Sequence, residues 1–103
     1  MIKVSVFYPQ NATSKFDMAY YLDKHIPMAR KLLGSALKGV AVEQGLAGAQ
    51  PGVPPTYAVV AHLSFDSMGS FAAAFLPIAP QLQGDLPNYT NVEPLIQFGE
   101  VKL

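Results

Sequence analysis

Two histidines are the residues in this sequence best suited to acid/base chemistry. His25 lies between Tyr21 and Met28, in a stretch where apolar residues recur at helical spacing. Histidine titrates near neutral pH, so His25 is either a general acid/base facing a pocket or a hydrogen-bonded residue of the core. His62 lies in a strand-like segment on the same face as Val60 and Ala58, where a structural role is more common than a functional one.

A polar turn near the end of the chain supplies the other candidate side chains. Asp85, Asn88 and Tyr89 offer a carboxylate, an amide and a phenol within six residues. Gly-Asp and Pro-Asn are good turn formers, so the segment is either a plain turn or a ligand-binding loop. We expect Tyr89 to be the side chain best able to reach a ligand. By contrast, we expect Tyr20 and Phe16 to serve packing or an interface.

Composition excludes several classes of protein. Among 103 residues, seven Lys and Arg balance seven Asp and Glu, and there is no cysteine. A neutral chain is a poor partner for nucleic acid or an anionic membrane surface. The absence of cysteine excludes disulfides and thiolate catalysis, and two histidines do not make a typical zinc site. There is no nucleotide-binding glycine loop. We therefore expect no metal, no cofactor and no nucleic-acid partner.

The chain also lacks the features of a membrane or exported protein. No stretch approaches the ~20 apolar residues that are needed to span a bilayer. Its first residues, Met1 to Val4, are typical of a strand and not of a signal peptide. We expect a single cytoplasmic domain.

Periodicity predicts six elements in the order β-α-β-β-α-β. The strands are expected at 1–8, 37–46, 57–65 and 94–103, and the helices at 15–34 and 67–76. Ser14 and Asp17 predict a capping box at the start of the first helix, and Gly34 a cap at its end. Pro27 predicts a kink or break inside that helix. A turn or short helix is expected at 78–82.

This order is typical of a ferredoxin-like α+β fold, a four-stranded antiparallel sheet with two helices on one face. In the first and third strands, apolar residues stand at both even and odd positions and therefore on both faces of the sheet. Two helices cover only one of these faces. The second face must therefore be covered by something else. In a chain this small, the expected partner is a second copy, which makes a homodimer.

Four segments together resemble the EthD family, which is named for a protein of ethyl tert-butyl ether degradation. They are KVSVFYP, FDMAYYLDKHIPMARKLLG, AHLSFDSMGSF and GDLPNYTNVEPLIQFGEV. The resemblance extends over nearly the whole chain, so residues 1–103 are expected to form one EthD-like domain. It implies a dimeric α+β barrel, in which two ferredoxin-like units pair sheet to sheet. It also points to Tyr21, His25, His62 and the Asp85–Tyr89 turn, without assigning a role to any of them.

The resemblance implies a superfamily that includes muconolactone isomerases and cofactor-free monooxygenases. Our first hypothesis is a cofactor-independent enzyme of isomerase, lyase or monooxygenase type for a small hydrophobic compound. In it, His25 is the acid/base, and Tyr21, His62 or Tyr89 orients the substrate. The second hypothesis is a non-catalytic accessory or ligand-binding protein of an ether or aromatic degradation pathway. The third is a chiefly structural dimer with a filled core.

Overall fold

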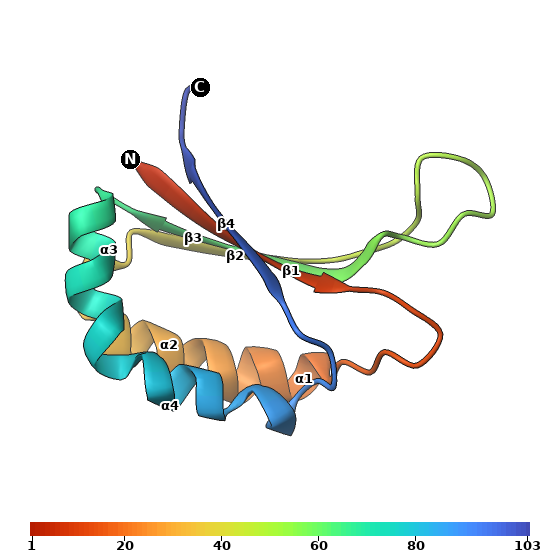
Figure 1. The fold of residues 1–103 in the computed structure, drawn as a ribbon, viewed down its shortest axis with the longest axis horizontal. Coiled ribbons are helices and arrows are strands. Elements are labelled where there is room, and N and C mark those ends of the chain that lie inside the picture. The colour runs from red at the N-terminus through yellow and green to blue at the C-terminus, as the bar shows by residue number, and fades with distance from the viewer.

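A computed structural model describes all residues 1–103 and shows the expected ferredoxin-like fold. Every pair of neighbouring strands is antiparallel, and the order across the sheet is β2-β3-β1-β4. Figure 1 shows all helices on one side of the sheet, while the opposite face is bare. The strands are β1 (Ile2–Pro9), β2 (Gly39–Gln44), β3 (Tyr57–Phe65) and β4 (Leu95–Glu100).

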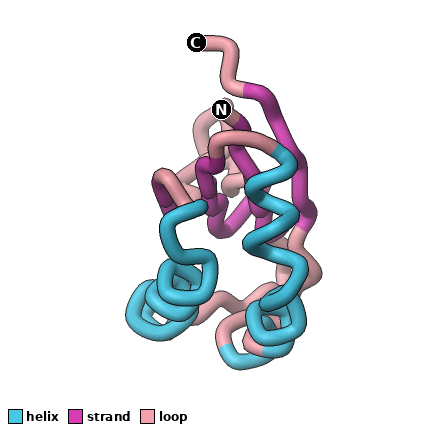
Figure 2. The backbone as a smooth tube through the Cα atoms, turned by 90° about the vertical axis from the view of Figure 1, so that its left-hand side faces the viewer, coloured by secondary structure: helices cyan, strands magenta, loops and turns pink.

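Two helical stretches lie side by side against the covered face (Figure 2). The first runs without interruption through α1 (Met18–Tyr20), the π-helical turn η1 (Tyr21–His25), α2 (Ile26–Leu33) and the 3₁₀ turn η2 (Gly34–Ala36). The second contains α3 (Met68–Phe75), η3 (Leu76–Ile78), α4 (Ala79–Gly84) and η4 (Leu86–Asn88). No helix is both long enough and apolar enough to cross a membrane.

The predicted start of the first helix is wrong by three residues. Asp17 is itself the N-cap, because its side chain accepts a hydrogen bond from the backbone N–H of Tyr20. Ser14 instead closes a local turn by donating its hydroxyl to the carbonyl of Asn11. At the other end the prediction is confirmed, since Gly34 caps α2 with φ +62°, a conformation that favours glycine.

Pro27 does not break the first helix. The helix widens one turn earlier, where the backbone N–H of Ile26 donates to the carbonyl of Tyr21 in an i→i+5 bond. Pro27 then occupies the first turn of α2, where a missing N–H costs little. The helical stretch therefore continues through Pro27 after one wider π turn, and His25 ends that turn.

The apolar residues form two buried clusters between the sheet and the helices. One holds Tyr8, Tyr21, Ile26, Val59, Ala61 and Tyr89, and the other Ile2, Val4, Ala29, Leu33 and Phe65. On the bare face, Phe7 contacts Tyr57. The strands are thus apolar on both sides, as expected. The loop between β2 and β3 projects past the end of the sheet (Figure 1), and its Leu46 is 92% exposed.

Phe65 offers a direct test of this core. Only 1% of Phe65 is exposed, and its ring packs edge-on against Phe71 of α3. Phe65→Ala should lower the free energy of unfolding by about 3–5 kcal/mol, because it leaves a cavity between sheet and helix. Urea denaturation measures the loss. Leu46→Ala, in the projecting loop, is the control and should stay within about 0.5 kcal/mol of the parent.

Candidate functional site

The carboxylate of Asp85 is the centre of the best-connected polar group in the molecule. Its Oδ1 accepts hydrogen bonds from the hydroxyl of Tyr20 at 2.6 Å and the amide of Asn88 at 2.9 Å. Its Oδ2 lies 2.9 Å from Nδ1 of His25. Three donors from two helical stretches therefore meet at one carboxylate.

Local structure explains why these side chains meet. His25 ends the π turn, and Tyr20 lies one turn earlier in the same stretch. Asp85 follows α4, and the backbone N–H of Asn88 donates to the carbonyl of Asp85, which closes the η4 turn. The Pro-Asn turn thus presents Asp85, Asn88 and Tyr89 toward the first helix, as expected of polar groups on a constrained loop.

The carboxylate of Asp85 is held in its ionised form. Burial alone raises its pKa, but hydrogen bonds from Tyr20, Asn88 and His25 lower it by more, so the pKa lies below its usual value. The hydrogen bond to the carboxylate in turn raises the pKa of the Tyr20 phenol. Tyr20 therefore acts as a donor at neutral pH, and Asp85 as the acceptor.

The two ring nitrogens of His25 have different environments. Because Asp85 is ionised, Nδ1 carries the proton that is donated to it. In the neutral form of a ring held in this way, Nε2 presents a lone pair. Nε2 of His25 makes no hydrogen bond within the chain. Every buried side-chain nitrogen or oxygen does have a hydrogen-bond partner, so Nε2 is not a buried atom. Nε2 therefore reaches the surface, although His25 as a whole is buried. This orientation is the one that a general base requires.

Three buried tyrosines lie behind the His25 ring. The hydroxyl of Tyr8 is 3.0 Å from that of Tyr89 and 3.5 Å from that of Tyr21. The Tyr21 ring stacks on His25 at 5.2 Å, and the Tyr89 ring lies 4.6 Å from it. Burial raises the pKa of Tyr8, Tyr21 and Tyr89, so all three phenols stay neutral.

Two hollows lie beside this aromatic group and not within it. One hollow of about 200 Å³ lies at the end of the sheet, and a shallower one of about 340 Å³ is lined by Asn88 and Tyr89. Both border Phe16, and neither is lined by Tyr21 or His25. The space between Tyr21 and His25 is filled by their stacked rings, so the accessible part of the site is Nε2.

His62 is separate from His25. It lies on the bare face of the sheet, where Nδ1 is 2.9 Å from the hydroxyl of Ser5 and Nε2 is 3.5 Å from the carboxylate of Glu43. His25 lies on the helix side, so the two histidines do not act on one ligand oxygen within a protomer. No group of three His, Asp or Glu side chains is arranged to hold a metal ion.

The structure therefore brings together Tyr21, His25, Asp85, Asn88 and Tyr89 from the sequence-derived candidates, and leaves His62 apart. Sequence reasoning missed two participants, Tyr20 and Tyr8. Packing or an interface is the role that the sequence predicts for Tyr20, yet its hydroxyl makes the shortest hydrogen bond to Asp85. Tyr8 lies on the inward face of β1, together with the buried Ile2 and Val4. Its hydroxyl was the available signal, since a buried phenol usually needs a polar partner.

Because of Asp85, the free energy of unfolding should fall as the pH is lowered into the acid range. A carboxyl whose folded pKa is depressed stabilises the fold above its unfolded pKa of ~3.9. That contribution is lost as pH falls through the folded pKa. Asp85→Asn should therefore lower the free energy of unfolding at pH 7, and its difference from the parent should shrink towards pH 3. Urea titrations at both pH values test this. The exposed Asp23→Asn is the control, and an Asp85→Asn difference that does not change with pH would contradict the assignment.

Comparison with known proteins places this architecture in a family. The family model for the EthD domain matches residues 9–92. An EthD-like protein of Ralstonia eutropha JMP134 is 41% identical, with a TM-score of 0.95 over 99% of this chain and 92% of that one. An ethyl tert-butyl ether degradation (EthD) family protein of Bacillus halodurans C-125 is 17% identical, with a TM-score of 0.67 over 99% of both chains.

A protein of Shewanella loihica PV-4, provisionally named a monooxygenase, shares the fold at 12% identity and a TM-score of 0.60, over 99% of this chain and 94% of that one. No curated protein matches the sequence. The family match spans most of the chain and includes the first helix and the Asp85–Tyr89 turn. The chain belongs to the EthD family.

Proposed function

We propose that this protein is a small cofactor-independent enzyme that uses His25 as a general base on a small hydrophobic organic compound of a degradation pathway. The observation that carries this proposal is the Asp85–His25 pair, in which Nδ1 is held by a carboxylate while Nε2 reaches the surface. A carboxylate on one nitrogen fixes the tautomer and stabilises the imidazolium when the other nitrogen takes a proton. The reaction is of isomerase, lyase or monooxygenase type.

Each step of the proposed chemistry has a named residue. Nε2 of His25 removes a proton from carbon beside a carbonyl, and the resulting imidazolium is stabilised by Asp85. Tyr20 and Asn88 fix the carboxylate. The proton then returns to another carbon in an isomerisation, or to a leaving group in an elimination. Tyr89, which lines the neighbouring hollow, is the candidate for orienting the substrate.

Proton abstraction can be measured before the natural substrate is known. Enolisable ring ketones incubated in deuterium oxide should exchange protons faster with the protein than without it, as followed by NMR. His25→Gln should lower the catalysed rate by about 10²- to 10⁴-fold, the usual contribution of one general acid/base. Circular dichroism should show an unchanged fold.

Lys24→Gln is the matched control for that experiment, because Lys24 is an exposed neighbour of His25 in the same turn. It should leave the exchange rate unchanged. If His25→Gln alters stability while exchange with every ketone stays at the level of the parent protein, His25 is only a packed core residue.

A second candidate function is supported by the packing around His25. Neither of the two hollows described above is lined by Tyr21 or His25, and one of them lies apart from the pair, at the end of the sheet. A non-catalytic accessory or ligand-binding protein of an ether or aromatic degradation pathway needs such a hollow and no titrating residue. A ligand that binds without any accelerated exchange would favour this alternative.

We also propose that two copies pair through their bare sheet faces as a homodimer. Phe7, Tyr57 and Leu95 lie on that face, and Leu95 is exposed. Beside them, the projecting loop carries the exposed Leu46. In the register of the sheet, Phe7 lies between Val60 and Leu95, next to a polar row of Ser5, His62 and Gln97. An exposed apolar patch is normally covered, and an obligate interface of this kind should bury roughly 2,000 Å² or more.

Phe7→Lys tests the dimer. A lysine placed in the centre of the interface would be buried without a partner, so the variant should elute as a monomer or unfold. Light scattering at micromolar concentration measures the mass, and circular dichroism separates the two outcomes. Ala19→Lys, on the exposed side of α1, should remain dimeric. A parent protein that is monomeric at that concentration would refute the proposal.

A further inference from the structure

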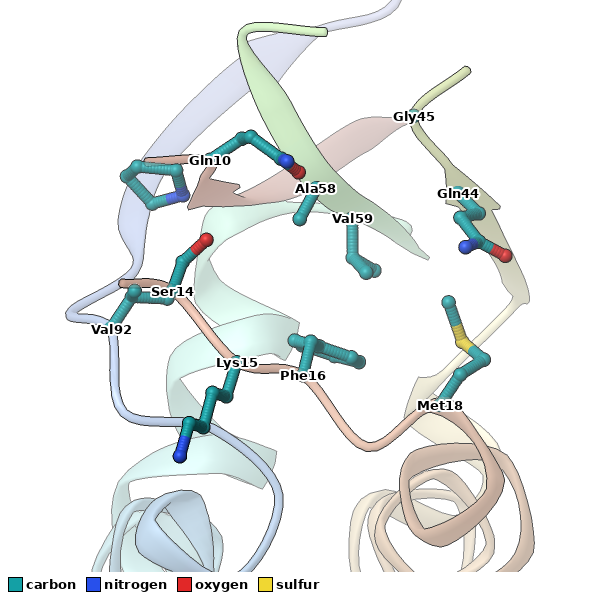
Figure 3. A pocket seen from close by; sticks show the side chains of 11 residues that line it. Gln10, Ser14, Lys15, Phe16, Met18, Gln44, Gly45, Ala58, Val59 and Val92 are labelled. Carbon is teal, nitrogen blue, oxygen red and sulfur yellow. The ribbon is translucent and has the colours of Figure 1, made fainter. Parts of the chain in front are cut away.

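The hollow of about 200 Å³ at the end of the sheet has the composition of a ligand site. It lies where β1 and β2 end, and the segment that leads into α1 closes it from below (Figure 3). Phe16, Met18 and Val59 provide an apolar floor. Small-molecule sites commonly combine such a floor with a few polar groups.

Two side-chain amides supply the polar groups. Gln10 and Gln44 come from opposite walls of the hollow (Figure 3). Both glutamines are exposed, and neither side chain makes a hydrogen bond within the chain. Outside the sheet ladder, the backbone N–H of Gln10 donates to the carbonyl of Thr56. Each amide is therefore free to donate and to accept. By contrast, the hydroxyl of Ser14 is already bonded to Asn11.

The charge around the hollow argues for a neutral ligand. Lys15 is the only ionisable residue in the lining, and Figure 3 shows its ammonium group directed away from the space. No carboxylate is available to hold an amine. An ionised ligand would thus lose water without gaining a charged partner, which is costly.

The volume limits the size of that ligand. An engineered apolar cavity of about 150 Å³ holds one benzene molecule. A hollow of about 200 Å³ accommodates one ring and a small substituent but not two fused rings. The amides would meet a hydroxyl or carbonyl on that ring.

We propose that this hollow binds a neutral single-ring compound that carries one hydroxyl or carbonyl group, with Gln10 and Gln44 as its hydrogen-bonding partners. The inference goes beyond the function proposed for His25. Phe16 lies against Tyr21 at 4.9 Å between ring centroids, and Tyr21 lies against His25, so two rings separate the hollow from the catalytic pair. The ligand is held without contact to His25.

Para-cresol, toluene and benzoate are suitable test compounds, because each has one ring. Para-cresol adds a hydroxyl to toluene, and benzoate carries a carboxylate in place of the methyl group of toluene. Calorimetry or NMR titration of the full chain should show binding of para-cresol in preference to toluene, and much weaker binding of benzoate. Gln10→Leu and Gln44→Leu should each reduce the ratio of para-cresol to toluene affinity by about 2- to 12-fold, the value of one neutral hydrogen bond. Gln50→Leu, in the exposed loop, should leave the ratio unchanged.

Two further variants make the outcome decisive. Met18→Trp should fill the hollow and abolish binding of both neutral compounds, with circular dichroism confirming the fold. His25→Gln should keep the affinity for para-cresol, so this proposal and the catalytic one fail separately. Absence of para-cresol binding, tighter binding of benzoate, or an affinity ratio insensitive to both glutamines would each overturn the proposal.

Discussion

The carboxylate of Asp85 is the interaction on which the arrangement of the two helical stretches depends. Tyr20 and His25 donate to it from the first stretch, and Asn88 donates from the turn that contains Asp85 itself. Hydrogen bonds to a charged group are about twice as strong as neutral ones, and a partly buried carboxylate without them would be costly. The same three bonds that fix the turn also orient the histidine, so structure and proposed chemistry share one group.

Much of the fold follows from local patterns in the sequence. The strand segments, Gly34 and the cap at Ser67 obey rules that act over a few residues. The π turn does not, because it depends on how Pro27 is accommodated inside a helix already packed on the sheet. The proline predicted a kink or break, whereas the helix continues through Pro27 after a wider turn at Tyr21–His25. The predicted start of the first helix was also wrong, because Ser14 and Asp17 can each either cap a helix or close a turn.

The candidate site shows the same division between local and long-range information. The turn around Asp85 could be found because polar groups on a Pro-Asn turn are unusual enough to stand out. The role of Tyr20 could not, since it requires Asp85 to lie beside the helix, 65 residues later in the chain. The alternation of side chains along a strand predicted that His62 lies on the same face as Val60, opposite to the buried Ala61. It did not reveal Ser5 and Glu43 as partners, because they lie on two neighbouring strands.

The aromatic residues connect these features physically. Phe16 borders both hollows and lies edge-on to Tyr8 and Tyr21, and Tyr21 stacks on His25. Rings with edge-to-face contacts keep their orientation while excluding water. Water exclusion strengthens the hydrogen bond between His25 and Asp85, and it also gives the hollow behind Phe16 an apolar wall. One set of packed rings therefore serves a polar pair on one side and a neutral cavity on the other, which explains why neither hollow reaches the histidine.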